Sequence, residues 1–337
     1  NYSGLRLQKD YNGGNTVFGG MMTAVNRRLW DTGLDYLHKS AYSGGFDLSH
    51  WWQGRTYFLT LTTAVSHVKG TPEAILETQE SPLRYYQRPD ASHVTLDPTR
   101  TSLTGHGGNF NIGKLGQGHL KYVAGLTWRS PGLELNDMGY LRQADVLMQF
   151  IWAGYNIWKP FAIFRDFNFN FNQWAGWDFS GQRVFQGGNF GIYSQLKNYY
   201  SFNISTNVQG EALSKSALRG GPSLRIPGGI SYYASLSTDS RKKLRFNISG
   251  STFTGKVDDR HSRSLSLGVT YRPSDALSLS VAPTVNRYDN QIQYVDTVDF
   301  NGESRYLMAA INQKTVGITL RMNFSITPDL SIQFYGQ

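Results

Sequence analysis

Apolar and polar residues alternate with a period of two along most of this chain. The longest alternating runs cover residues 167–172, 265–271 and 316–326. Because successive side chains of a β-strand point to opposite faces, each run has one apolar face and one polar face. Soluble β-sandwiches also alternate, but their strands are shorter and their outer faces carry more charge. The pattern predicts an antiparallel transmembrane β-barrel in which Phe169, Leu267 and Ile318 face lipid.

Two kinds of connection separate the alternating runs in turn. Short, turn-forming connections lie at 12–14, 53–55, 115–118, 159–160, 197–198, 239–241, 273–275 and 327–329. Longer polar connections cover 29–39, 70–100, 130–143, 175–183, 211–221, 255–262 and 294–305. Antiparallel hairpins with turns at one rim and loops at the other have this arrangement, which predicts about sixteen strands. The expected starts are near Ser3, Thr16, Ala41, Thr56, Ser102, His119, Val146, Phe161, Val184, Tyr200, Ser223, Lys242, Ser264, Leu277, Tyr306 and Leu330.

The two ends of the chain both read as strand sequence. Asn1 leads directly into an alternating run, and residues 330–337 end within another. We expect a single outer-membrane barrel domain over residues 1–337, as a fragment of a longer polypeptide whose further strands close the barrel. An export signal would have been removed or would lie outside this sequence.

Composition narrows the class of protein further. Hydrophobic residues make up 39% of the chain and aromatic residues 14%. No apolar run approaches the ~18–20 residues of a membrane-spanning helix, whereas abundant aromatics suit the interfacial girdles of a barrel. A large lectin or a propeller is the soluble alternative, but the chain lacks the blade-length repeat of a propeller. The absence of cysteine excludes disulfides, thiol catalysis and cysteine-ligated metals. The net charge of +9 is spread along the chain without a basic cluster, which argues against nucleic acid as a partner.

Several loop strings identify a resemblance that covers nearly the whole chain. They are YYQRPDA at 85–91, LNDMGYLRQAD at 135–145, SALRGGP at 216–222, KSAYSGG at 39–45, RKKLR at 241–245 and SLTGHGG at 102–108. They resemble the C-terminal barrel region of the Bacteroidota outer-membrane family catalogued as domain of unknown function 5916. The resemblance implies a Gram-negative outer membrane, an upstream sugar-binding-like sandwich that is missing here, and strands beyond Gln337. It implies no catalytic residue and no cofactor.

Candidate catalytic groups do not form a recognisable set. His106 stands among glycines 105, 107 and 108 without a second histidine at ligand spacing, so we interpret these glycines as permitting a bend or the close approach of inserted backbone. Asp137, Asp145 and Arg142, with Glu134 nearby, are interpreted as a loop-stiffening ion pair of Arg142 with one of the aspartates. His261 and Ser262 are adjacent in a strand and point to opposite faces. We therefore expect no enzyme activity, no metal and no cofactor.

The remaining candidates are recognition residues in the loops and polar residues in the strands. Residues in the 70–100 and 130–143 loops combine the large contact area and directional hydrogen bonds of binding hot spots: Tyr85, Tyr86, Arg88, Asp90, Asn136, Asp137, Tyr140 and Arg142. We expect both loops to be ordered on the rim of long loops and either to fold over the lumen or to contact a partner. Tyr85, Tyr86, Trp128, Trp174 and Trp177 either stack on sugars or, for the tryptophans above all, form an interfacial girdle.

Candidate lumen-lining residues are Asn168, Asn170, Arg245 and Arg321. The two arginines either select anionic solutes or, as we favour, pair with acidic residues. Together these features predict a non-enzymatic outer-membrane barrel that is a transport pore or a subunit of a larger envelope complex. A glycan-binding or glycan-processing surface protein and a plugged transporter are the alternatives. The expected partners are membrane lipid and envelope proteins, with a glycan as the open alternative.

Overall fold

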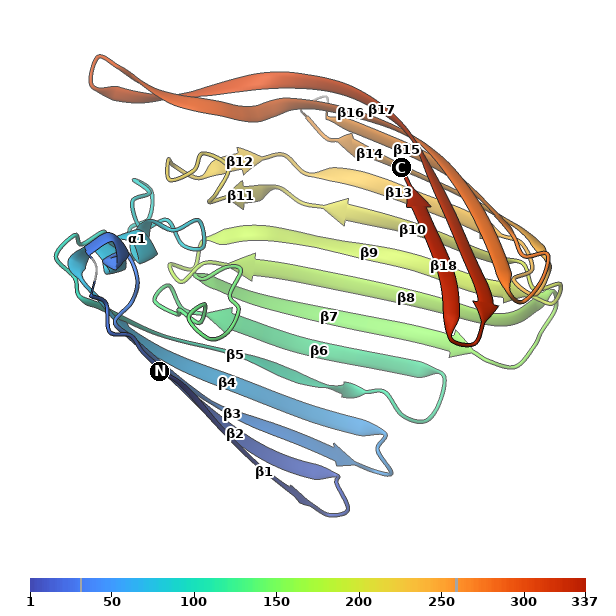
Figure 1. Cartoon of the computed structure of the whole chain (residues 1–337), viewed down its shortest axis with the longest axis horizontal. Coiled ribbons are helices and arrows are strands. Elements are labelled where there is room, and N and C mark those ends of the chain that lie inside the picture. The colour runs from blue at the N-terminus through green and yellow to red at the C-terminus, as the bar shows by residue number, and fades with distance from the viewer. Residues whose placement is uncertain (31, 258–259) are drawn as a thin grey trace. The chain divides into compact units, whose positions relative to one another are not determined.

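The computed structural model describes residues 1–30, 32–257 and 260–337, and they form an all-β structure (Figure 1). The long strands are β1 Tyr2–Tyr11, β2 Thr16–Asn26, β3 Ser40–Trp52, β4 Tyr57–Lys69, β5 Ser102–Lys114, β6 Leu120–Arg129, β7 Val146–Ile157, β8 Phe164–Trp177, β9 Arg183–Leu196, β10 Ser201–Gln209, β13 Gly229–Ser237, β14 Leu244–Gly255, β15 His261–Tyr271, β16 Leu277–Phe300, β17 Glu303–Thr327 and β18 Leu330–Gly336. The short elements are η1 Thr32–Leu34, α1 Pro72–Glu80, β11 Ala212–Ser214 and β12 Leu224–Ile226. Within the described ranges, no helix has the length and hydropathy needed to cross a membrane.

The long strands join in one antiparallel sheet of 16 strands, in chain order from β1 to β10 and then from β13 to β18, while β11 and β12 form a separate hairpin. Among the described residues, no pairing joins β1 to β18. Contacts divide the chain into two compact units. Unit 1 contains residues 1–153, 173–186 and 211–226, and unit 2 contains residues 154–172, 187–210 and 227–337.

The predicted strands are confirmed in number, with three corrections to their bounds and connections. The eleventh long strand begins at Gly229 instead of near Ser223, because residues 224–226 belong to the β11–β12 hairpin. The predicted 294–305 loop is wrong, since β16 and β17 continue to a tight turn at Asn301 and Gly302. Both turn residues have positive φ, 56° and 80°, which suits a two-residue hairpin turn and which asparagine and glycine tolerate. The predicted 175–183 loop is likewise shorter, because β8 ends at Trp177 and β9 begins at Arg183.

Strand pairing in unit 2 separates an apolar face from a polar face. Residues directly opposite in antiparallel strands share a face, and Leu265 is opposite Val285, which is opposite Val316. Leu267 and Ile318 lie on this apolar face and are 43% and 51% exposed. On the polar face, pairing aligns what we call the arginine row: Arg245, Thr270, Ser280 and Arg321. The alternation in the sequence therefore becomes a two-faced sheet.

The sheet of unit 1 has the same two faces, but rim segments cover part of the polar side. Leu61 and Phe110 are paired on the apolar face, whereas Asn111 donates to Thr60 on the other. The face that carries Thr60 and Asn111 also carries a set of buried residues aligned across four strands, which we call the covered row: Val25, Ala41, Val68 and Leu103. Ile75 of α1 and Tyr86 pack on this row, and Val94 and Leu96 flank it. The helix begins where Thr71 accepts a hydrogen bond from the Ala74 N–H, with Pro72 in its first turn.

Candidate functional site

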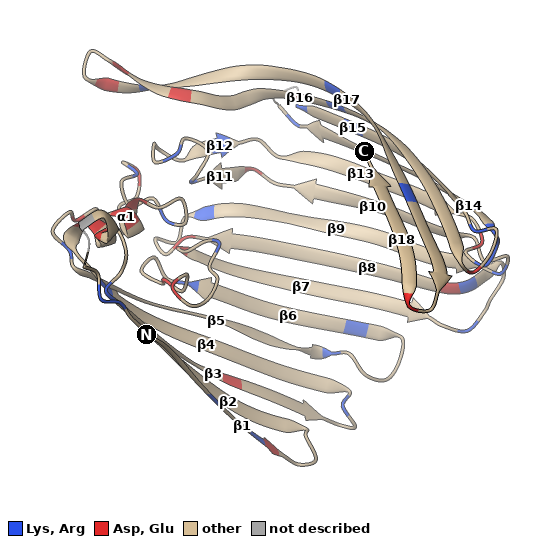
Figure 2. Cartoon of the chain, in the orientation of Figure 1, with Lys and Arg blue, Asp and Glu red and all other residues tan. Residues whose placement is uncertain are grey.

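Several buried or half-buried ion pairs of unit 1 involve the segments that connect its strands at one rim. Figure 2 shows charged residues gathered mainly near strand ends and around α1, with few along the strands. We call the assembly of segments 70–101, 130–145, 178–182 and 211–226 the rim cap. Its geometry decides what the predicted recognition residues can do.

The first segment of the rim cap folds back on itself over the covered row. The Gln79 side chain, which is fully buried, donates to the Asp97 carbonyl at 2.9 Å and accepts from the Asp97 N–H at 3.0 Å. These two bonds satisfy a buried amide and close the loop between α1 and residue 97. Tyr85 and Tyr86 are 9% and 6% exposed, so they form part of a small core and present little surface.

The second segment inserts its backbone against β5. A Cβ on Gly105 would lie 2.0 Å from the Leu133 nitrogen, and a Cβ on Gly107 would lie 2.8 Å from the Leu133 side chain. Of the two roles expected for these glycines, a bend or the close approach of inserted backbone, the structure shows the close approach. Leu133 packs with Leu141 and Ala144 in a second buried cluster.

A buried ion pair fixes this inserted segment to the first one. Arg84, whose side chain is fully buried, donates to the Glu134 carboxylate at 2.6 Å and to the Leu133 carbonyl at 3.0 Å. Ser66 of β4 accepts from the Glu134 N–H at 2.9 Å. Charge-assisted bonds between buried partners are strong, and the loss of either partner leaves the other charge buried without compensation.

Asp145 is the point at which four rim segments meet. Its carboxylate accepts from the Lys215 ammonium at 2.6 Å, from His93 Nε2 at 2.9 Å and from the Phe179 N–H at 3.0 Å. Burial opposes ionisation of Asp145, but Lys215 and the hydrogen bonds outweigh it and hold the pKa of Asp145 below its usual range. Burial also lowers the pKa of the Lys215 ammonium, which Asp145 partly offsets.

The same place contains a set of potential metal ligands. One ligand atom each from His93, Asp145 and Asp178 lie within 4.8 Å of one another. However, Lys215 already supplies a cation to Asp145, and Asp178 accepts from the backbone of its own turn at Ser180 and Gln182. We assign the group to an ion network that holds the loops together.

A second network surrounds Asp137. Its carboxylate accepts from Arg27 at 2.5 Å and from His38 Nδ1 at 2.6 Å, and His38 Nε2 lies 2.7 Å from the Thr78 hydroxyl of α1. These bonds outweigh the desolvation of Asp137 and hold its pKa below the usual range. The predicted pairing of Arg142 with Asp137 or Asp145 is wrong within the described residues, because Arg27, His38 and Lys215 take those positions.

The structure separates the predicted recognition residues into two groups. Arg88 is buried, donates to the Ser223 hydroxyl at 2.8 Å, and lies 3.7 Å from Asp90, which accepts from the Ser223 N–H. Asn136 accepts from the Leu141 N–H and shapes its own loop. Only Tyr140, which is 78% exposed, and Arg142 present free side chains. Sequence reasoning missed Arg84, His93 and Lys215, for which no local signal exists.

The predicted lumen residues all lie on the polar face of unit 2. Asn170 lies beside Gly191, while its neighbour Asn172 donates to Asn189 at 2.7 Å. Asn168 shares this parity on β8, and Phe169 lies on the other side, where its ring meets Phe190 at 4.4 Å.

Both arginines of the arginine row lack acidic partners in the described part of the chain. Arg245 donates to the Lys242 carbonyl at 3.1 Å, and the Arg321 guanidinium lies 5.1 Å from the Tyr335 ring centre. The favoured interpretation, pairing with a carboxylate, is thus not met within these residues.

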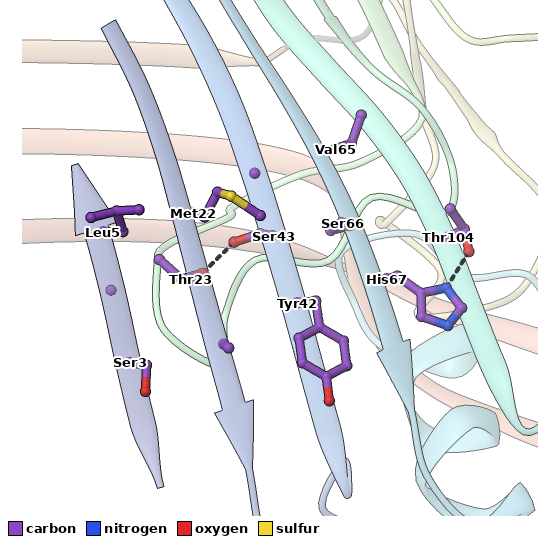
Figure 3. A pocket seen from close by; sticks show the side chains of 13 residues that line it. Ser3, Leu5, Met22, Thr23, Tyr42, Ser43, Val65, Ser66, His67 and Thr104 are labelled. Carbon is purple, nitrogen blue, oxygen red and sulfur yellow. Dashed lines mark hydrogen bonds between the residues drawn. The ribbon is translucent and has the colours of Figure 1, made fainter. Parts of the chain in front are cut away.

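An apolar recess of about 480 Å³ lies on the exposed face of unit 1 (Figure 3). Leu5, Met22 and Val65 border it. Gly44, which has no side chain, also lines the recess and leaves space between its neighbours. Tyr42 and His67 stand at the end nearer the rim cap, and His67 Nδ1 lies 2.6 Å from the Thr104 hydroxyl. An apolar surface with aromatic residues at its border is typical of a lipid-facing sheet.

Comparison with solved structures identifies the fold as that of an outer-membrane β-barrel. The chain is similar to the siderophore receptor PirA from Acinetobacter baumannii, with a TM-score of 0.52 and 10% identity over 96% of this chain and 57% of the receptor. It also matches BauA, the ferric preacinetobactin receptor of Acinetobacter baumannii, with a TM-score of 0.49 and 11% identity over 99% of this chain and 59% of that one. The anion-selective porin from Comamonas acidovorans matches with a TM-score of 0.39 and 8% identity over 95% of this chain and 90% of the porin. The chain thus spans less than two thirds of the length of these two receptors.

The family follows from the sequence match. The family described as "Domain of unknown function (DUF5916)" matches residues 68–336, and the chain belongs to it. No curated protein matches the sequence.

Proposed function

We propose that this protein is a non-enzymatic transport barrel of a Gram-negative outer membrane, with a polar face that lines the path of solutes. The observation that carries the proposal is the arginine row, in which Arg245 and Arg321 stand among hydroxyl side chains without acidic partners in the described residues. Uncompensated arginines on a polar barrel wall favour anions. The family resemblance adds a Bacteroidota envelope to this proposal.

The apolar face of unit 2 supports the membrane location. Leu265, Leu267 and Val316 are 49%, 43% and 69% exposed, and water would make such a continuous apolar surface unfavourable. Lipid contact removes that cost while the strand pairing satisfies the backbone.

Conductance of the full-length protein in planar bilayers tests the proposal. We expect ion-conducting channels with a preference for chloride over potassium, which the double variant Arg245→Gln, Arg321→Gln reduces. Each single variant, Arg245→Gln or Arg321→Gln, is compared with Arg305→Gln as control. The control also removes one positive charge, from a 58% exposed side chain near the β16–β17 turn, where Arg305 pairs with Glu303. Absence of channels, or equal selectivity in the double variant and the wild type, contradicts the proposal.

A second function, membership of a larger envelope complex, is favoured by the β16–β17 hairpin. Pairing with β15 ends at Asp289 and pairing with β18 begins at Leu320, yet β16 and β17 remain paired as far as Phe300 and Glu303 (Figure 1). Within the described residues this extension is a two-stranded ribbon, with Val295 and Phe300 55% and 60% exposed. Isolated two-stranded ribbons are marginally stable in water, so a partner would stabilise this one.

Native purification tests this second function. Full-length protein with residues 293–309 replaced by a short Asn-Gly turn should lose partners that wild-type protein retains, while the barrel still assembles. Identical partner profiles contradict the role of the hairpin.

A further inference from the structure

A cavity within the rim cap has a lining whose charge points to one class of ligand. Its volume is about 290 Å³, and four chain segments form it: residues 82–85, residues 142–144, the start of β9, and the end of β11 with the two residues that follow. The Ala144 N–H donates to the Leu83 carbonyl at 3.0 Å and holds two of these walls together. The volume lies at the lower limit of ordinary ligand sites, so the cavity suits a small molecule.

Three cationic residues line this cavity: Arg84, Arg142 and Lys215. The other polar side chains of the lining are hydroxyls and an amide, which can all donate hydrogen bonds, and no carboxylate is among the lining residues. Arg84 and Lys215 pair with the carboxylates of Glu134 and Asp145, which are not lining residues, and Arg142 has no such partner among the described residues. A ligand that accepts hydrogen bonds and carries negative charge matches this lining.

The cations of the lining retain capacity for a ligand. Lys215 uses two of its three N–H donors on Asp145, on the carboxylate and on the carbonyl, each at 2.6 Å. Arg142 is exposed and forms no ion pair with the carboxylates of the described chain. Arg84 bonds through Nη2 to Glu134, whereas its buried Nε and Nη1 have no hydrogen-bond partner in the described residues, so these donors remain unused.

Backbone conformation at this cavity adds a separate observation. Tyr85 in its wall and Asp145 next to Ala144 have positive φ angles of 48° and 54°. Neither residue is a glycine, and such strained conformations concentrate at ligand sites, where the surrounding structure holds them.

We propose that this cavity binds a small soluble anion that carries carboxylate or phosphate groups, with Arg142 and Lys215 as its main charged partners. Ser214 and Ser216 supply hydroxyl donors beside them. This inference does not rest on the proposed transport function, because binding at the rim cap is independent of conduction through the barrel.

Calorimetric titration of the purified full-length protein in detergent tests the site, with citrate, inorganic phosphate and neutral glucose as probes. We expect citrate or phosphate to bind, glucose not to bind, and affinity for the anion to fall about tenfold in Arg142→Gln. Arg225→Gln is the matched control, because Arg225 is 73% exposed on β12, pairs with Glu211 and lies outside the cavity lining. A substitution of Lys215 would also break its ion pair with Asp145 and could disturb the rim cap itself. Arg142→Gln therefore tests binding of the anion more directly.

Each other result overturns the proposal. These results are no binding of either anion, equal binding of glucose, or equal affinities in Arg142→Gln and Arg225→Gln. A preference for citrate over phosphate, or the reverse, identifies which acidic group the cavity takes.

Discussion

The covered row of unit 1 and the arginine row of unit 2 start from the same alternation and end in opposite surroundings. Both are cross-strand rows on the polar side of their sheets. The covered row is apolar and buried because α1 and Tyr86 pack on it, whereas Arg321 of the arginine row is exposed. The character of a position on this face thus depends on which segment covers it, and less on the strand that carries it.

The comparison also concerns charge. In the rim cap, Arg84 and Asp145 are buried and each has a partner of opposite sign within 2.6 Å. In the arginine row, neither arginine has such a partner among the described residues, and none is needed where water reaches the side chain. The Arg84 and Asp145 ion pairs are therefore structural, whereas both arginines of the arginine row, like Arg142 of the rim cap, remain available to solutes.

The largest expected effect comes from removing the charge at the centre of the rim cap. Asp145→Asn keeps the shape of the side chain and tolerates the φ of 54°, because asparagine adopts this conformation readily. It removes the carboxylate that pairs directly with the Lys215 ammonium, which should destabilise the rim cap by about 3–5 kcal/mol. Hydrogen exchange of amides in residues 82–97 and 211–226 measures this local free energy of opening.

Glu303→Gln is the control for that variant. Glu303 is 71% exposed and pairs with Arg305 on the hairpin, and exposed pairs contribute less than about 1 kcal/mol. Equal effects of the two variants would show that Asp145 does not hold the rim segments together.

The second prediction concerns the close packing of the inserted segment against Gly105 of β5. Gly105→Ala places a Cβ against the backbone of Gly132 and Leu133, so the inserted segment must move, at a cost of about 1–3 kcal/mol. Gly268→Ala, on the polar face of unit 2, meets its nearest atom at 3.6 Å and should change stability by less than about 0.5 kcal/mol. Limited proteolysis within residues 130–143, with the barrel still folded, distinguishes the two variants. Similar cleavage of both would contradict the close packing at Gly105.

The third prediction is a loss of rim-cap stability in acid. The pKa values of Asp145 and Asp137 are lowered in the folded protein, so near neutral pH both carboxylates are ionised in either state and their stabilisation is fully present. As the pH falls through about 3.9, the unfolded state takes up protons first, and the stabilisation disappears once the pH passes below the folded-state values. Hydrogen exchange of the rim segments between pH 6 and pH 3 measures this decline, which should be smaller in Asp145→Asn. A pH-independent wild type would contradict the assigned ion pairs.

The strands could be predicted from the sequence because their signal is local. The period of two within residues 265–271 and 316–326 depends only on neighbours in the chain and on the two faces of a strand. The β16–β17 extension was missed because Asp296 and Asp299 resemble loop residues, although the Asn301–Gly302 turn was a readable hairpin signal.

The rim cap could be predicted only in part. Glycines 105 and 107 indicated that inserted backbone could approach their strand closely. The partners of Asp145, in contrast, lie far away in the sequence: His93 is 52 residues before it and Lys215 is 70 residues after it. The residues next to Lys215 in the sequence do not show that it pairs with Asp145. Those next to Arg142 do not show that it leaves Asp137 unpaired. Which loop charges pair is decided by tertiary packing, and this information is absent from a single sequence without related sequences.

The smallest expected effect tests the other side of the comparison, that the arginine row is dispensable for the fold. Arg321→Gln removes an exposed charge that lies beside the Tyr335 ring and has no acidic partner among the described residues. The free energy of unfolding should therefore change by less than about 0.5 kcal/mol. Denaturant unfolding of the full-length protein in detergent measures this value, with Arg84→Met as the contrasting variant because it strands the buried Glu134 carboxylate. If Arg321→Gln were as destabilising as Arg84→Met, Arg321 would have a structural partner outside the described residues, and its role in selecting solutes would lose its support. If stability is unchanged while the preference for chloride falls, Arg321 acts on solutes, whereas the Arg84–Glu134 pair of the rim cap acts on structure.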